Sequence, residues 1–169
     1  GIEWREADAM NLPFPDARFG GVACGLGLMF VPDKKKAVAE MRRVLVTGGR
    51  LGLTVYGPIE HNPATFALAG ALDRHLGPDA SATKRAEHAL ADPALLRTLV
   101  AGAGFCRIQI VTETRIVRFA SASDYVCTQL TATPLASLLS QHAGGPARHL
   151  AQALTADVTA ALQARQPDD

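Results

Sequence analysis

The chain has 169 residues, of which 48% are hydrophobic and 20% are charged, and its formal net charge is +1. This length suits one ordinary domain with a substantial core, and the small net charge gives no electrostatic reason to expect a nucleic-acid partner. Aromatic residues make up only 5% of the chain, and no basic stripe is interleaved with them to form base-stacking platforms. We therefore expect a globular protein with no nucleic-acid partner.

The cysteines and the apolar runs indicate the cellular compartment of the protein. Cys24, Cys106 and Cys127 are odd in number and widely spaced, which is typical of free thiols in a reducing cytoplasm. The histidines lack the spacing of metal ligands. The longest apolar run, GGVACGLGLMFV, is shorter than the roughly 18 residues of a membrane span. We expect a cytoplasmic protein with no metal and no membrane partner.

The first part of the chain predicts two strands separated by a loop. Residues 2–8 alternate loosely in polarity and predict a strand, and Pro13 and Pro15 then interrupt regular structure. The apolar segment 20–28 contains too many glycines for a stable helix and predicts a buried strand. Its glycines mark places where the backbone passes close to another group.

A helix and a third strand follow. Pro32 and Asp33 start a helix with one apolar stripe, and Gly48 and Gly49 are expected to end it. Residues 50–56 then alternate in polarity as a strand does. A strand, a helix and a strand in this order predict a parallel pair joined by a right-handed crossover.

The remaining chain predicts more helices and a hairpin. Helices are expected after the capping residues Asn62 and Asp92. Residues 105–119 contain two β-rich runs joined near Glu113, too close for a crossover helix, and predict an antiparallel hairpin. From Ser121 onward the pattern is helical. The fold class is therefore α/β, with a mostly parallel sheet that ends in a hairpin and with extra C-terminal helices.

Three separated motifs carry a family resemblance. ADAMNLPFPDARF, FVPDKKKAVAEMRRVLVTGGRL and AGAGF resemble, in family order, class I S-adenosylmethionine-dependent methyltransferases, and most nearly the small-molecule group that includes quinone-biosynthesis enzymes. The similarity runs from about residue 3 to about residue 119. It implies a Rossmann-like sheet, S-adenosylmethionine as cofactor and methyl transfer to a small organic acceptor. Residues 1–120 would be a partial methyltransferase domain and 121–169 a helical extension packed on it.

The resemblance also implies roles for the residues after the first predicted strand. Asp8 resembles the acid that accepts a hydrogen bond from the adenine amino group. The Ala9 backbone would face the acceptor nitrogen of the ring, and Met10 would pack on the ring. The alternative for Asp8 is a loop-starting or capping acid.

A second set of site residues follows the strands at 20–28 and 50–56. Gly25 resembles the position where the backbone approaches the methionine part of the cofactor, with Cys24 and Leu26 flanking it. The alternative for Gly25 is close packing within the chain. Tyr56 and His61 are candidates for orienting or deprotonating the methyl acceptor, and the alternative is a structural tyrosine and a surface histidine.

Two elements of the family have no counterpart in these 169 residues. The glycine-rich loop after the family's first strand and the acid that ends its second strand would both lie before Gly1. In the family they hold the amino-acid and ribose portions of the cofactor. If each supplies one strong hydrogen bond of about 1.5–3 kcal/mol, losing both weakens binding about a hundredfold to ten-thousandfold. We expect a truncated form, with its N-terminal strands missing, that binds the cofactor poorly or not at all.

These missing strands suggest three arrangements for residues 2–8. The segment is expected to detach, to pair with the strand at 20–28, or to pair with another copy. An apolar edge left exposed at 20–28 is prone to association, so a homodimer through that sheet edge is expected. The second functional hypothesis is a non-catalytic methyltransferase-like module that acts by protein association.

Overall fold

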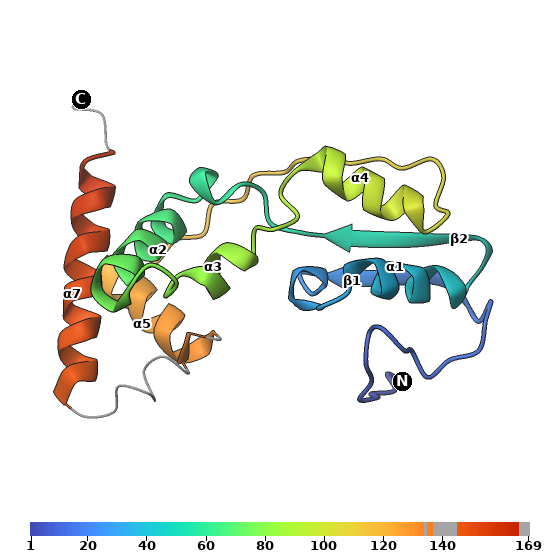
Figure 1. Cartoon of the computed structure of the whole chain (residues 1–169), viewed down its shortest axis with the longest axis horizontal. Helices are drawn as coiled ribbons and strands as arrows, with labels where there is room; N and C mark the ends of the chain where they lie inside the picture. The colour runs from blue at the N-terminus through green and yellow to red at the C-terminus, as the bar shows by residue number, and fades with distance from the viewer. Residues whose placement is uncertain (134, 137–144, 166–169) are drawn as a thin grey trace. The chain divides into compact units, whose positions relative to one another are not determined.

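The computed structural model describes residues 1–133, 135–136 and 145–165 (Figure 1). The chain forms two compact units. One comprises Gly1–Gly57 with Glu87–Thr112, and the other comprises Pro58–Ala86 with Glu113–Asp169. The chain passes between these units three times. The sequence predicts a partial methyltransferase domain at 1–120 and a helical extension at 121–169. That division rests on family resemblance and stays a prediction.

A parallel pair of strands and its crossover helix organise the first unit. Strand β1 spans Phe19–Gly25, helix α1 spans Lys34–Arg43 and strand β2 spans Leu45–Thr54. The two strands pair in parallel, as predicted. The Asp33 side chain caps α1 by accepting a hydrogen bond from the Lys36 N–H at 2.9 Å, which satisfies one of the unpaired donors of the first turn. The α/β class with a parallel sheet is thus confirmed.

The double glycine lies inside β2 and does not end the preceding helix. Strand β2 begins at Leu45 instead of residue 50, and the pairing register is irregular between Phe19 and Gly21 of β1. Gly48 has a φ of +79°, a backbone conformation that favours glycine. The prediction that these glycines stop the helix was wrong, because the same conformational freedom serves an irregular stretch of strand.

The core of the first unit lies between α1, the strands and a further helix. Helix α4, Pro93–Gly102, follows the capping residue Asp92 and packs against α1. The fully or nearly fully buried residues of this core are Leu28, Ala37, Val38, Met41 and Leu90. The helix predicted after Asp92 is therefore confirmed, and it covers the apolar stripe of α1.

Helices make up the second unit. They are α2 (Pro63–Leu76), α3 (Ala82–Ala86), α5 (Ala122–Ala132) and α7 (Gly145–Gln163), with a short 3-10 helix at Ile59–His61 (Figure 1). Helix α7 packs against α2 and α5. Their shared core includes Leu68, Leu72, Val126, Leu130, Leu154 and Val158.

Side-chain caps and one buried polar pair fix the helices of the second unit. Asn62 and Ser121 cap α2 and α5, as their residue types predict. The hydroxyl groups of Thr65 and Tyr125 lie 3.1 Å apart inside the core. Because each hydroxyl can donate and accept, this pair is satisfied without water.

Two segments predicted as strands are not strands in the structure. Residues 2–7 have no strand partner in the described chain, and Asp8 forms only an isolated antiparallel bridge with Asn11. Residues 105–119 also contain no strand. Both sequences alternate in polarity, but a strand needs a pairing edge, and Trp4 and Ile116 are 87% and 78% exposed. The structure does not show the predicted hairpin. Residues 2–8 do not pair with β1, and detachment and pairing with another copy stay predictions.

In the described ranges, no helix combines the length and the apolar character needed to cross a lipid bilayer.

Candidate functional site

The carboxyl ends of β1 and β2 lie side by side and form the edge where open α/β sheets bind ligands. Gly25 at the end of β1 pairs with Thr54 at the end of β2. The Leu26 N–H then donates to the Thr54 carbonyl at 3.0 Å and to the Thr54 Oγ1 at 3.2 Å. These bonds hold the chain just beyond β1 against the end of β2.

Leu26 has an unusual backbone conformation at this edge. Its φ is +50°, in the left-handed region that residues other than glycine rarely adopt. Such strain costs of order 1–3 kcal/mol and tends to occur at functional sites. The Leu26 side chain is 40% exposed. Sequence patterns gave no sign of this strain, because leucine at this position carries no turn signal.

The space around Gly25 and Gly27 shows whether packing requires glycine at these positions. A Cβ added at Gly25 would lie 3.7 Å from the Thr54 Oγ1, which is an ordinary contact, and one at Gly27 would lie 3.5 Å from the Cys24 Sγ. Gly25 also lacks a positive φ. Packing within the unit therefore does not require glycine at position 25.

Asp8, Ala9 and Met10 form a hydrogen-bonded turn. The Asp8 Oδ1 accepts from the Met10 N–H at 2.8 Å, and the Asp8 carbonyl accepts from the Asn11 N–H at 2.9 Å. Asp8 thus has the local turn role that its residue type favours. Within the described residues, its Oδ2 has no hydrogen-bond partner, so one carboxylate oxygen can still accept from a ligand.

The two groups of predicted cofactor residues share one core. Ala9, Met10 and Cys24 are half-buried and pack against the buried cluster around Val38 and Met41 of α1. Asp8 and Leu26, next to them in the chain, are exposed. All six predicted cofactor residues thus lie in the first unit, and the side chains of Ala9, Met10 and Cys24 pack against its core.

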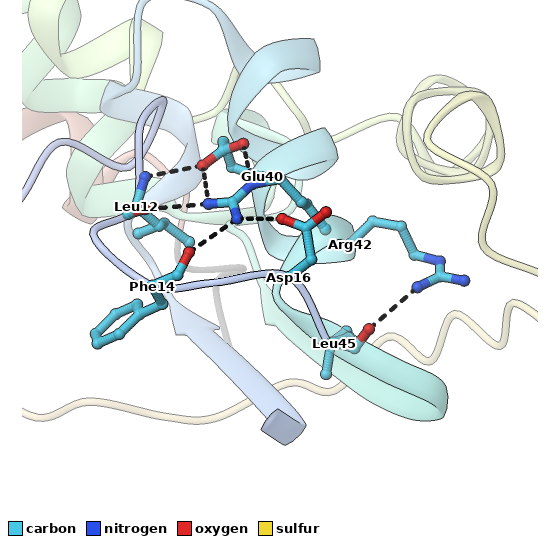
Figure 2. A network of polar contacts seen from close by, with 7 residues as sticks. Leu12, Phe14, Asp16, Glu40, Arg42 and Leu45 are labelled. Atoms are coloured by element: carbon cyan, nitrogen blue, oxygen red, sulfur yellow. Dashed lines mark hydrogen bonds and ion pairs between the residues drawn. The ribbon is translucent and has the colours of Figure 1, made fainter. Parts of the chain in front are cut away.

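A charged network ties the loop after Asp8 to helix α1 (Figure 2). The Arg43 guanidinium donates to both carboxylate oxygens of Glu40, to the Leu12 and Phe14 carbonyls and to the Asp16 carboxylate, over 2.7–3.0 Å. Glu40 also accepts from the Leu12 N–H at 2.9 Å. The hydrogen bonds from Arg43 lower the pKa of the Glu40 carboxyl, and Glu40 and Asp16 raise the pKa of Arg43. The sequence motifs do not indicate a role for Arg43 and Glu40.

Tyr56 lies beside His88, a neighbour that the sequence does not predict. The Tyr56 and His88 rings are 5.3 Å apart between centroids, and the His88 Nδ1 lies 2.6 Å from the Gly57 carbonyl oxygen. Because a carbonyl only accepts, the Nδ1 must carry a proton, which leaves the Nε2 of the neutral ring with a free lone pair.

His61 and Tyr56 belong to different units of the chain. His61 ends the 3-10 helix of the second unit, whereas Tyr56 and His88 belong to the first unit. Nearness in sequence led to pairing Tyr56 with His61. No local signal could have pointed to His88, because its contact with Gly57 spans 31 residues of chain.

The fold of the first unit fits a known class of architecture. A parallel strand–helix–strand unit with a strained backbone and glycines at its carboxyl edge fits a Rossmann-like domain. Over the described residues, no group of three or more metal-binding side chains comes together.

Part of the chain is similar to known proteins. Residues 1–53 match the family described as "Methyltransferase domain". The chain is 38% identical over 80 residues to 2-phytyl-1,4-beta-naphthoquinone methyltransferase of Arabidopsis thaliana, covering 47% of this chain and 31% of that protein. It is 42% identical over 73 residues to demethylmenaquinone methyltransferase of Deinococcus radiodurans, covering 43% and 28%. No solved structure matches it significantly.

These matches confirm the resemblance drawn from the three motifs. Residues 1–53 match a methyltransferase domain, and the aligned segment is similar to quinone-biosynthesis enzymes of the class I S-adenosylmethionine-dependent methyltransferases, whose methyl donor is S-adenosylmethionine. The matched segment spans less than a third of the length of either relative.

Proposed function

We propose that the protein transfers a methyl group from S-adenosylmethionine to a carbon of a quinone-type ring. The observation that carries the proposal is the match of residues 1–53 to a methyltransferase domain, which contains both the Asp8 turn and the carboxyl edge of β1. Both relatives described above are named for naphthoquinone or menaquinone substrates. A ubiquinone/menaquinone biosynthesis C-methyltransferase of Teredinibacter turnerae, 48% identical over 50 residues, supports carbon as the methylated atom.

On the cofactor side, the proposal assigns two binding regions. The free oxygen of the Asp8 carboxylate accepts a hydrogen bond from the adenine amino group, the Ala9 backbone faces the ring and Met10 packs on it. Gly25, with Cys24 and Leu26, lies along the methionine part. The sulfonium is already activated, so the protein's task is to bring the acceptor carbon in line with the methyl group, and no catalytic triad is needed.

On the acceptor side, methylation at carbon produces a proton. The cofactor would supply an activated methyl group, and a ring carbon that received it would have to lose its hydrogen as a proton. We assign the Nε2 lone pair of His88, next to Tyr56, as the base that accepts this proton. His61 remains a predicted acceptor-orienting residue in the second unit.

The other expectations from the sequence remain proposals. We place the protein in the cytoplasm because its three cysteines are unpaired, and we expect neither nucleic acid nor membrane as a partner. A homodimer through the β1 edge also remains a prediction. The methyltransferase names of the relatives favour an enzyme over a non-catalytic module.

Methyl transfer can be tested with S-adenosylmethionine and a demethylated naphthoquinol, following the methylated product by mass spectrometry. We expect product with the wild-type chain and less with Asp8→Asn, because an amide can turn a donor toward the adenine amino group. Asp79→Asn changes an exposed acid of the second unit and should leave product formation unchanged. Equal product from wild type and Asp8→Asn would exclude the assigned role of Asp8.

A further inference from the structure

We propose that Arg43 and Glu40 of α1 are positioning residues for the adenine end of the cofactor site, acting through the backbone of Leu12. The inference rests on the proposed function, since it assumes that Asp8 contacts adenine. Neither side chain would touch the cofactor. Their role would be to fix the direction in which the Asp8–Met10 turn presents its carboxylate and its backbone.

The first observation is that Arg43 uses every donor it has. Its Nε donates to the Glu40 Oε1, its Nη1 to the Phe14 carbonyl and the Asp16 Oδ1, and its Nη2 to the Leu12 carbonyl and the Glu40 Oε2. An arginine has five N–H groups in a rigid planar fork, and these five bonds match that number. A lysine has three donors on one nitrogen and cannot reproduce this set.

The second observation is that Leu12 is held from both sides of its peptide backbone. Its N–H donates to the Glu40 Oε2 at 2.9 Å, and its carbonyl accepts from the Arg43 Nη2 at 3.0 Å. These two α1 side chains are bound to each other through both Glu40 oxygens. Both backbone polar groups of Leu12 are therefore bound by one ion pair.

The third observation is that the held residue directly follows the Asp8 turn. Leu12 directly follows Asn11, whose N–H donates to the Asp8 carbonyl, and the Met10 N–H donates to the Asp8 Oδ1. The turn has no strand partner to fix it, since the Asp8–Asn11 bridge is isolated. Apart from the packing of Ala9 and Met10 on the core, the hold on Leu12 is what orients it.

The end of the loop is held independently of the Arg43 side chain. The Ala17 N–H donates to the Arg43 carbonyl, and the Arg18 and Phe19 N–H groups donate to the Val44 carbonyl. These backbone bonds fix the start of β1 whatever side chain stands at position 43. Replacing Arg43 should therefore release the Leu12–Asp16 part of the loop without unpairing the strands.

The neighbouring arginine provides a matched control. Arg42 makes a long hydrogen bond from its Nη1 to the Leu45 carbonyl at 3.4 Å (Figure 2). Its guanidinium lies 6.0 Å from the Phe105 ring centroid. It does not hold the loop. Arg42→Lys and Arg43→Lys thus make the same chemical change on one helix, at a position outside the network and at one inside it.

The test compares two ligands in NMR titrations of the 169-residue chain, S-adenosylhomocysteine and S-inosylhomocysteine. Inosine has a carbonyl where adenine has its amino group, so Asp8 should favour the adenosyl ligand by roughly 10- to 100-fold, the worth of one charge-assisted hydrogen bond. A variant that is only less stable binds both ligands less well and keeps their ratio. We expect Arg43→Lys and Glu40→Gln to bring the ratio close to one and Arg42→Lys to preserve it.

The outcomes separate this inference from the proposed function. A wild-type chain that does not distinguish the ligands would overturn the Asp8–adenine contact and the positioning role together. A wild-type preference that persists in folded Arg43→Lys or in folded Glu40→Gln would overturn the positioning role alone. If Arg43→Lys does not fold, Glu40→Gln decides the question, because it keeps the shape of the side chain but removes its charge and replaces one acceptor oxygen with an amide donor.

Discussion

Replacing Gly25 with alanine should separate folding from cofactor binding. The new Cβ would lie 3.7 Å from the Thr54 Oγ1, an ordinary contact, and the backbone at Gly25 has no positive φ. Alanine also reduces the freedom of the unfolded chain, so we expect a stability gain of about 0.4–1 kcal/mol. If Gly25 leaves room for the methionine part of the cofactor, the same methyl group should weaken S-adenosylhomocysteine binding at least about tenfold, a cost of about 1.4 kcal/mol.

Urea unfolding and ligand titration of the same samples measure the two effects. Gly49→Ala is the control for crowding, because its Cβ would lie 3.0 Å from both the Val46 carbonyl oxygen and the Leu45 Cδ2. It should lose about 1–3 kcal/mol, the usual cost of overpacking. If Gly25→Ala also loses more than about 1 kcal/mol, glycine at this position serves packing. Unchanged ligand affinity in a stable Gly25→Ala would contradict the close approach of the cofactor.

Three further predictions concern separate parts of the molecule. Hydrogen bonds from Arg74 lower the pKa of the Asp157 carboxyl. Stability from this pair is therefore complete above the unfolded pKa of about 3.9 and lost as pH falls through the lower folded value. Urea melts at falling pH should show a smaller acid loss in Asp157→Asn, and equal losses would contradict the pairing. Leu154→Ala empties a fully buried site and should cost about 2–5 kcal/mol in urea melts, so a loss below about 1 kcal/mol would contradict its burial. Imidazole nitrogen NMR of neutral His88 should show the proton on Nδ1, and a proton on Nε2 would contradict its bond to Gly57.

Features set by neighbouring residues were predictable from the sequence. Asp33, Asn62, Asp92 and Ser121 were expected at helix starts, and each side chain accepts a hydrogen bond from the first turn of its helix. The chemistry of a cap lies within three or four residues, so sequence patterns contain it. The parallel pairing of β1 and β2 was predictable for a similar reason, because a crossover helix between two apolar strands dictates it.

Features that depend on distant partners were not predictable. The segment 105–119 has the alternation of a hairpin but forms no strand, because alternation describes a face and does not supply a pairing edge. Gly48 and Gly49 show that one residue type serves two purposes, since a positive φ ends helices and also permits irregular strands. In the site, the family motif located the Asp8 turn, whereas the Arg43 network and the His88 contact join segments about 30 residues apart.

Binding of S-adenosylhomocysteine to the chain, followed residue by residue through its amide NMR signals, tests the central claim most directly. The claim is that the cofactor occupies the Asp8 turn and the carboxyl edge of β1. We predict amide chemical-shift changes that saturate with ligand at Ala9, Met10 and Leu26. The changes at Ala9 and Met10 should be lost in Asp8→Asn, and the signals from α5 and α7 should not change. Saturable shifts confined to the second unit, or none at the highest soluble ligand concentration, would contradict it.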